Sequence, residues 1–297
     1  MSTYNANQLL TQAVSHHQNN QLAQARPLYE KYLAIDPNNP DCLYFLGLLY
    51  VQLDELQKAI GVLIKACELN SNHAASFNTL GFAQLELKQF LPAIDSLKRA
   101  IHLQPNLVDA HYNLGNALQD AHRHEEAIKS YENALALQSS NPHIHFNKAN
   151  SLRYLRDFQG AVQSYNQALA LEPQFTEALC NKAGCLEQLG LYQDAIAACK
   201  SALAIRPDFA TAHWNLAFCY LLLGDFENGW KEHEWRWLSP DLPVYQERRN
   251  FDQPLWLGKE SLQGKTILLY AEQGLGDTLQ FCRFVSSVKQ LGAASLN

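Results

Sequence analysis

Four asparagines recur at every 34th position, namely Asn113, Asn147, Asn181 and Asn215. A carboxamide offers both a hydrogen-bond donor and an acceptor, so a row of exposed carboxamides could hold a peptide backbone without selecting its sequence. Each such bond contributes about 0.5–1.5 kcal/mol net, so four alone would give roughly millimolar binding. Other side chains must then add to the affinity. The alternative is that these amides bond neighbouring helices within the protein.

A second row lies one residue earlier and is largely aromatic, with Tyr112, Phe146 and Trp214 in phase with Tyr44, Asn78 and Cys180. Aromatic side chains provide a large contact area at low entropic cost, which suits a binding groove; packing between helices is the alternative. Further groove candidates are Asn116, Asn150, Gln119 and Arg153. Arg153 is the one basic residue on this strip, since Lys148 and Lys182 fall at another helix position. The sequence therefore predicts a peptide-binding surface rather than a cluster that grips phosphate or carboxylate.

Histidines and cysteines could bind a metal, but their spacing favours packing. His111, His145 and His213 recur in phase, which places them a full repeat apart. His122 and His124 fall at a turn between helices, where we expect solvated side chains. The seven cysteines have no C-x-x-C pair and mostly occupy apolar helical stretches, which predicts small apolar side chains in a reducing compartment. No metal site and no cofactor is expected.

The composition argues against several classes of partner and location. The net charge of −6 and the pI near 6.0 argue against nucleic-acid binding. The N-terminus shows no secretory signal, and no apolar run of membrane-spanning length occurs. We therefore expect a cytoplasmic protein without a membrane contact.

The candidate residues must be positioned by repeated helix pairs. Small residues occur at every 34th position in the first helix, at Ala13, Gly47, Gly81, Gly115, Ala149, Ala183 and Ala217, and alanines do so in the second, at Ala25, Ala59, Ala93, Ala127, Ala161 and Ala195. A larger side chain where helix axes approach closely would cost about 1–3 kcal/mol. Prolines end several units, at Pro37, Pro105, Pro173 and Pro207. Stacked helix pairs of this kind bury a continuous core.

These recurring positions resemble the tetratricopeptide (TPR) repeat family. The resemblance implies an all-α fold, a right-handed superhelical solenoid of antiparallel helix pairs whose first helices line a concave surface. We place about seven units in residues 6–243, with atypical first and last units, and a linker in residues 244–258. The asparagine row is similar to the one lining the superhelix of the O-GlcNAc transferase family. The paired-carboxylate clamp of chaperone-binding TPR domains is not supported.

Residues 259–297 follow a different pattern. Thr266–Ala271 is an apolar run typical of a buried strand, a glycine turn follows at Gly274 and Gly276, and Thr278–Leu291 is predicted to be an amphipathic helix. This is one strand-turn-helix of a Rossmann-like domain. The tail AASLN contains no evident second strand, so we expect the strand to lack a parallel partner.

The segments GDFENGWKEHEWRW, PLWLG and ILLYAEQGLGDTLQFCRF resemble bacterial TPR proteins with a C-terminal glycosyltransferase-like domain of the GT-B type, which includes the heptosyltransferase family. That resemblance implies a catalytic base at Asp277, and the alternative is that Asp277 caps the following helix. The chain ends soon afterwards, at Asn297, so we expect a truncated or remnant domain and no glycosyl transfer.

Three hypotheses follow from the sequence. The favoured one is a scaffold that binds a peptide or protein in the groove of the solenoid. The second is the substrate-recognition part of a TPR-linked glycosyltransferase. The third is an assembly module that forms oligomers through its apolar C-terminal segment.

Overall fold

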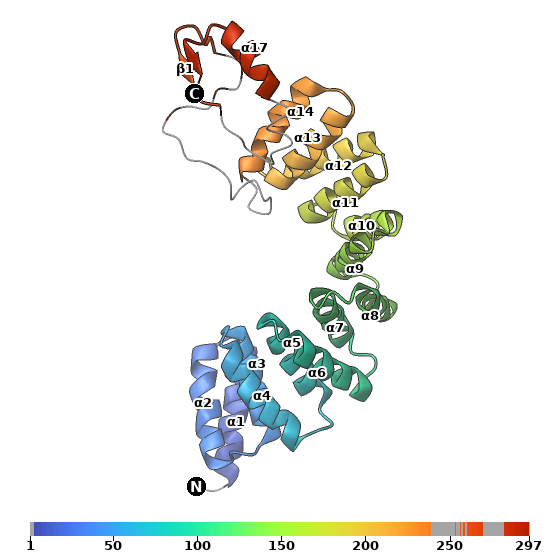
Figure 1. The fold of residues 1–297 in the computed structure, drawn as a ribbon. Coiled ribbons are helices and arrows are strands. Elements are labelled where there is room, and N and C mark those ends of the chain that lie inside the picture. The colour runs from blue at the N-terminus through green and yellow to red at the C-terminus, as the bar shows by residue number, and fades with distance from the viewer. Residues whose placement is uncertain are drawn as a thin grey trace. The chain divides into compact units, whose positions relative to one another are not determined.

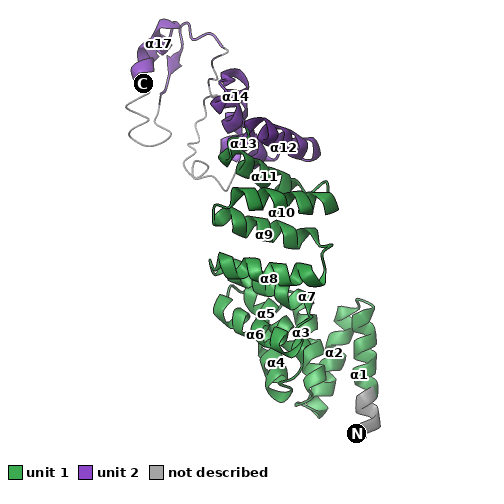
Figure 2. Ribbon diagram, turned by 90° about the vertical axis from the view of Figure 1, so that its right-hand side faces the viewer, with its two compact units in different colours: residues 1–191 green, residues 192–297 purple. Residues whose placement is uncertain are grey.

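The computed structural model describes residues 3–238, 253, 256, 258, 260–269 and 282–296. Helices joined by short turns make up most of this part of the chain (Figure 1). The chain divides into two compact units, residues 1–191 and residues 192–297 (Figure 2). The all-α helix-pair fold predicted from the sequence is confirmed.

The first unit contains five complete helix pairs and the first helix of a sixth. The helices are α1 Thr3–Gln18, α2 Leu22–Ile35, α3 Pro40–Gln52, α4 Leu56–Leu69, α5 Ala74–Glu86, α6 Phe90–Leu103, α7 Val108–Asp120, α8 His124–Leu137, α9 Pro142–Tyr154, α10 Phe158–Leu171 and α11 Thr176–Gln188. Each second helix packs against its own first helix and against the first helix of the next pair. No pair could bury its apolar face alone, and this arrangement joins the pairs into continuous cores.

The small residues in the first helices lie where the two helices of a pair meet. A Cβ atom added to Gly47 would lie 2.5 Å from Leu63 Cγ, and one added to Gly115 would lie 2.4 Å from Cε1 of the Tyr131 ring. Leu63 and Tyr131 are fully buried and occupy the same phase of the second helix, two repeats apart. The recurring glycine and alanine pattern is therefore explained by close helix packing.

The turn inside each pair uses the same backbone conformation every time. A residue with positive φ stands at Asn20, Asp54, Lys88, His122, Arg156, Gly190 and Gly224, again once in every repeat. Among these, only Gly190 and Gly224 adopt the left-handed region without a steric cost. The turn between pairs differs, because the closing prolines Pro37, Pro105 and Pro173 lie in turns that follow the second helices.

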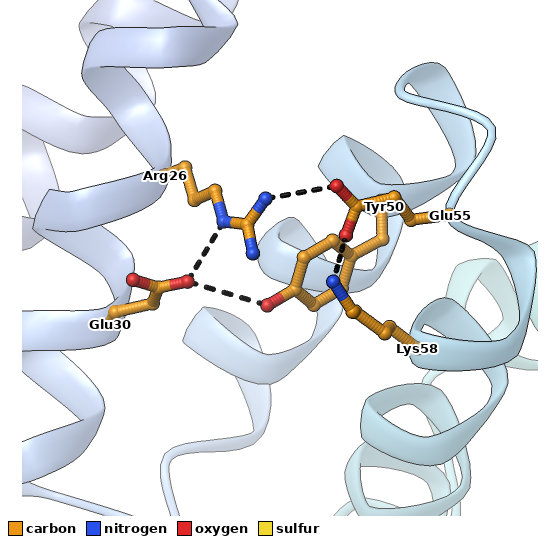
Figure 3. Close-up of polar contacts among 5 residues, drawn as sticks. All are labelled: Arg26, Glu30, Tyr50, Glu55 and Lys58. Carbon is orange, nitrogen blue, oxygen red and sulfur yellow. Dashed lines mark hydrogen bonds and ion pairs between the residues drawn. The ribbon is translucent and has the colours of Figure 1, made fainter.

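The atypical first pair is fastened to the second by a polar network, which Figure 3 shows. Arg26 on α2 contacts Glu30 Oε1 through Nε and Glu55 Oε1 through Nη1, both at 2.9 Å. Lys58 on α4 lies 2.6 Å from Glu55 Oε2, and the Tyr50 hydroxyl donates to Glu30 over 3.5 Å. The hydrogen bond from Lys58, followed by the charge of Arg26, lowers the pKa of Glu55.

The inner side of the first unit is made by its first helices. Neighbouring first helices contact one another along the unit, as α3 does with α5, α5 with α7, α7 with α9 and α9 with α11. The second helices of neighbouring pairs have no comparable set of contacts within the described residues. The first helices therefore lie on the inside of the curve, and side chains that project from them away from the core share one surface.

The second unit holds α12 Tyr192–Ile205, α13 Ala210–Leu222, α14 Phe226–His233 and the 3₁₀ helix η1 Glu234–Leu238. Tryptophans are concentrated in its last helical turns. The Trp235 ring stacks on His213 with centroids 3.9 Å apart and an interplanar angle of 4°. His213 is also hydrogen-bonded to Glu232. Trp235 thus closes the end of this helix pair against α13.

The C-terminal segment corrects one expectation. Strand β1, Thr266–Ile267, pairs in parallel with β2, Ser295–Leu296, so the predicted strand has the partner that the sequence had not suggested. The Ala294 amide also donates to the Lys265 carbonyl over 2.9 Å. The described part of the predicted helix consists of the 3₁₀ helix η2 at Cys282–Phe284 and of α17 at Val285–Gln290. Residues 270–281, which include the glycine turn and Asp277, lie outside the described residues.

Candidate functional site

A hollow of about 640 Å³ lies on the inner side of the first unit. Its walls come mainly from α9 and α11, with single residues from α7, from the turn after α9 and from the starts of α8 and α10. The lining residues are Gln119, His124, Asn150, Arg153, Tyr154, Arg156, Phe158, Asn181, Gly184, Glu187 and Gln188. Four of the residues predicted from the sequence, Gln119, Asn150, Arg153 and Asn181, therefore come together here.

The asparagine row forms a chain of amide contacts between successive repeats. Asn113 Nδ2 donates to Asn78 Oδ1 over 3.2 Å. Asn147 Nδ2 donates to Asn116 Oδ1 over 2.9 Å and to the Tyr112 hydroxyl over 3.2 Å. These contacts match the alternative interpretation, in which the amides bond neighbouring helices.

The same contact repeats one unit later, where Asn181 Nδ2 donates to Asn150 Oδ1 over 3.0 Å. Asn147, Asn150 and Asn181 remain partly exposed, whereas Asn113 is buried. A carboxamide has two donor hydrogens and two acceptor lone pairs, so these bonds leave part of its capacity free. The row therefore ties the repeats together and still presents polar groups on the inner side.

Two buried tyrosines, which sequence reasoning missed, hold the amide acceptors in place. The Tyr131 hydroxyl donates to Asn116 Oδ1 over 2.8 Å and contacts Gln119 Oε1 at 3.0 Å. The Tyr165 hydroxyl donates to Asn150 Oδ1 over 2.6 Å. Burial raises the pKa of both phenols, so they act as neutral donors at neutral pH. Their spacing of one full repeat was the available signal.

The aromatic row is half-buried along its length. The Tyr112 ring lies 6.3 Å from Tyr131, and the Phe146 ring lies 4.7 Å from Phe175 and 5.9 Å from Tyr165, measured between centroids. These residues pack between helices and keep one part of the ring at the surface. Cys180, which is in phase with them, is 1% exposed.

The last two predicted residues lie on α13 in the second unit. Trp214 is half-buried and meets Phe218 edge-on, with ring centroids 4.8 Å apart. Asn215 is half-buried as well. Both residues belong to the second unit, whereas the hollow belongs to the first.

The in-phase histidines fasten the loops between helix pairs. Nε2 of His111, His145 and His213 contacts a backbone carbonyl in the preceding turn, on Pro105, Ser139 and Pro207, at 2.8, 3.1 and 2.8 Å. Within the described residues, no group of three histidines, cysteines or carboxylates is placed to hold a metal ion. The three histidines thus connect α7, α9 and α13 to the turns that precede them.

The expectation of two solvated turn histidines holds only for His122. His122 is exposed and carries the positive φ of the turn. His124 is the first residue of α8 and is 7% exposed, because the Tyr154 ring stacks on it with centroids 3.7 Å apart. Burial, aided by the nearby His122, lowers the pKa of His124. The contact joins residues of two different repeats, so local spacing gave no sign of it.

The charged residues of the hollow come from different elements. Arg153 on α9 and Arg156 in the following turn are exposed, and Arg156 lies over the Phe158 ring at 6.0 Å. Glu187 on α11 accepts a hydrogen bond from Gln188 over 3.1 Å. Arg156 was not among the predicted residues, because the repeat phase placed only Arg153 on the inner strip.

The cysteines behave as small apolar side chains. The seven cysteines, all among the described residues, form no disulfide bond, and each is buried except Cys282, which is exposed. Burial raises the pKa of Cys42 to about 12 and that of Cys185 to about 11. These thiols are therefore protonated and unreactive at neutral pH.

Among the described residues, none of the helices combines the length and the apolar character that a membrane span requires.

Sequence-family models of the tetratricopeptide repeat match residues 16–76, 108–141 and 146–208, and a TPR repeat model matches residues 89–121. The helix pairs described above occupy these same stretches. The chain therefore carries tetratricopeptide repeats. A search among curated protein sequences found no match.

Solved structures share the fold. YrrB, described as a TPR protein with an unusual peptide-binding site, is 19% identical, with a TM-score of 0.56 over 62% of this chain and 95% of its own. A structure of PilF from Pseudomonas aeruginosa is 20% identical, with a TM-score of 0.60 over 70% and 94%. A MamA structure is 27% identical, with a TM-score of 0.52 over 57% and 92%. This chain is thus similar in fold to several TPR proteins.

Proposed function

We propose that the protein is a scaffold that binds a peptide or protein segment along the inner side of its TPR helix pairs. The observation that carries the proposal is the hollow on α7, α9 and α11, which is lined by amide and charged side chains. Most of the lining residues carry polar side chains that could hydrogen-bond a peptide backbone or a charged group. TPR proteins of this fold are suited to protein–protein contacts, and YrrB is described as having a peptide-binding site.

The tyrosine-held amides give the proposed surface its rigidity. Asn116 and Asn150 accept from buried hydroxyls at 2.8 and 2.6 Å, so their orientation is set before a partner arrives. A preorganised surface loses less conformational entropy on binding. Extended peptide backbone, which has alternating donors and acceptors, matches the free capacity of such a row.

The experiment is a selection of binding peptides from a random library against the full chain, followed by affinity measurement on two variants. Gln188→Trp places a bulky ring at the exposed rim of the hollow, and Gln167→Trp places the same ring at an exposed position of α10, outside the hollow. We expect Gln188→Trp to weaken binding and Gln167→Trp to leave it unchanged. Equal effects of the two variants, or a library without any binder, would contradict the proposal.

A second candidate function is the recognition part of a TPR-linked glycosyltransferase. The parallel pairing of β1 with β2 around α17 favours it, because such a unit begins a Rossmann-like domain. Asp277 is the residue to test. Sugar transfer to a bound peptide by the protein as the cell makes it, abolished by Asp277→Asn, would support this candidate, and transfer that Asp277→Asn leaves unchanged would count against it.

A further inference from the structure

The basic residues of the hollow lack ionic partners. Arg153 and Arg156 lie close together in sequence and are both exposed, and neither forms an ion pair with a carboxylate of the described residues. Arg26 and Arg123 in the same unit are paired with glutamates at 2.7–2.9 Å. Two guanidinium groups that line one hollow and form no ion pair create a local positive potential, and Arg is suited to bidentate contact with a carboxylate.

His124 gives a second, independent indication that the hollow binds a ligand. It lines the same hollow, is 7% exposed, and neither ring nitrogen has a hydrogen-bond partner within the described residues. A buried polar group without a partner is costly and rare in a native structure. Tyr154, which stacks on the ring, is itself 60% exposed, so its side chain has space to turn away.

The lining of the hollow also contains one acidic residue. Glu187 belongs to α11, while both arginines belong to α9 and its turn. An acidic group that enters the hollow is repelled by Glu187 and attracted toward Arg153 and Arg156. The amides of Asn150 and Asn181, which line the same hollow, are bonded to each other at 3.0 Å.

We propose that the hollow is a specificity pocket for an acidic side chain, aspartate or glutamate, of the bound peptide; this inference rests on the proposed function. The carboxylate pairs with the guanidinium groups of Arg153 and Arg156. Tyr154 turns aside, and His124 donates a hydrogen bond from the ring nitrogen that becomes accessible. The peptide backbone lies across the amides, which bind it whatever its sequence. The pocket then selects for an acidic side chain at one position of the peptide.

The test uses capped peptides of alanine, serine and tyrosine that differ only in a central glutamate, glutamine or lysine. A fourth peptide has the central glutamine and a free C-terminal carboxylate. Each is titrated into the full chain at low ionic strength, and binding is followed by NMR signals of the arginine side chains and of the backbone. We expect the glutamate peptide to bind about fivefold more tightly than the glutamine peptide, as two partly exposed ion pairs would give.

Variants separate the contributing groups. Arg153→Gln and Arg156→Gln should each reduce the preference for glutamate and leave the glutamine peptide unaffected. Glu187→Gln should strengthen glutamate binding, because it removes a like charge. His124→Phe should also reduce the preference for the glutamate peptide without lowering the stability of the fold. A purely structural role of His124 would instead predict lower stability and an unchanged preference.

The outcomes are distinct. Equal affinity for the glutamate and glutamine peptides, with signals shifting along α7, α9 and α11, would overturn the acidic specificity while leaving peptide binding intact. A preference confined to the peptide with the free C-terminus would overturn the side-chain assignment. Absence of any shift on the inner side with every peptide would contradict both this inference and the proposed function.

Discussion

The first three repeats and the next three use the same helix-pair frame in different ways. In the early repeats the inner positions are filled by packing: the Phe45 ring stacks on Tyr29 with centroids 6.4 Å apart, and Tyr44 meets His73 edge-on at 4.8 Å. In the later repeats the corresponding surface carries the amides of Asn116, Asn150 and their neighbours. The early repeats therefore use these positions for packing, whereas the later repeats present polar groups there.

The largest expected effect is on stability in the early repeats. Leu63 is fully buried against Gly47, so Leu63→Ala should lower the free energy of unfolding by about 2–5 kcal/mol through lost burial and an unfilled cavity. Asn147→Ala in the later repeats should cost only about 1 kcal/mol, the net contribution of a hydrogen bond. Urea unfolding followed by circular dichroism measures both. Equal losses would remove the distinction between the two regions.

The next effect tests the link between helix packing and the amide row. Gly115→Val would drive a side chain into the Tyr131 ring and should cost about 1–3 kcal/mol. Because Tyr131 holds Asn116 and Gln119, this variant should also weaken peptide binding. Gly47→Val is the matched control, since it displaces the apolar Leu63 and should reduce stability without a direct effect on binding. Retained affinity in Gly115→Val would show that the tyrosine does not position the amides.

A smaller effect, of opposite sign, is expected at His124. His124→Phe keeps the stack on Tyr154 and removes two unpaired buried nitrogens, so stability at neutral pH should rise by roughly 1 kcal/mol. A gain in stability together with a loss of binding preference is the pattern expected when a residue is retained for function. A loss of stability would instead assign His124 a supporting role in the fold.

The same residue makes stability depend on pH. The pKa of His124 is lowered in the folded protein, so the fold favours the neutral form of the ring. As the pH falls through the ordinary histidine pKa of about 6.5, the unfolded chain therefore binds more protons than the folded protein. Stability should therefore fall as the pH is lowered from about 7.5 to about 5.5. His17, whose pKa is also lowered by burial, contributes in the same direction. His124→Phe should flatten this dependence in part, and an unaltered slope would contradict the assigned pKa shift.

The smallest expected effect lies in the turns. Lys88 holds a left-handed backbone conformation with φ 58°, which glycine adopts without strain. Lys88→Gly should stabilise the protein by up to about 1 kcal/mol, after the added entropy of the unfolded chain is counted. Gly190→Ala is the reverse control, because its new Cβ meets nothing within 4 Å and any loss comes from the backbone alone. Thermal unfolding of the pair measures both signs.

The 34-residue period was sufficient to predict most of the fold. Glycine and alanine at every 34th position, together with the prolines, were enough to place the helix pairs, because close packing allows so few side chains there. The asparagine row was also visible, but its contacts with Asn78, Asn116 and Asn150 were not, since they join different repeats. The positions predicted for peptide binding remain predictions.

The hollow could not be predicted from the 34-residue period. His124 and Tyr154 belong to different repeats, so their contact leaves no sign in local spacing. Arg156 lies in a turn and has a positive φ, a conformation that the sequence does not predict for arginine. The parallel pairing of Thr266 with Ser295 was missed for a similar reason. Very short strands of this kind have no periodic signal, because alternation needs a longer segment.

Hydrogen exchange of the full chain, with and without a peptide selected from the library, tests the central claim most directly. We predict added protection in α7, α9 and α11 around the hollow, and little change in α8 and α10. Protection concentrated on the second helices, or in the early repeats alone, would contradict the assignment of the inner side as the binding surface.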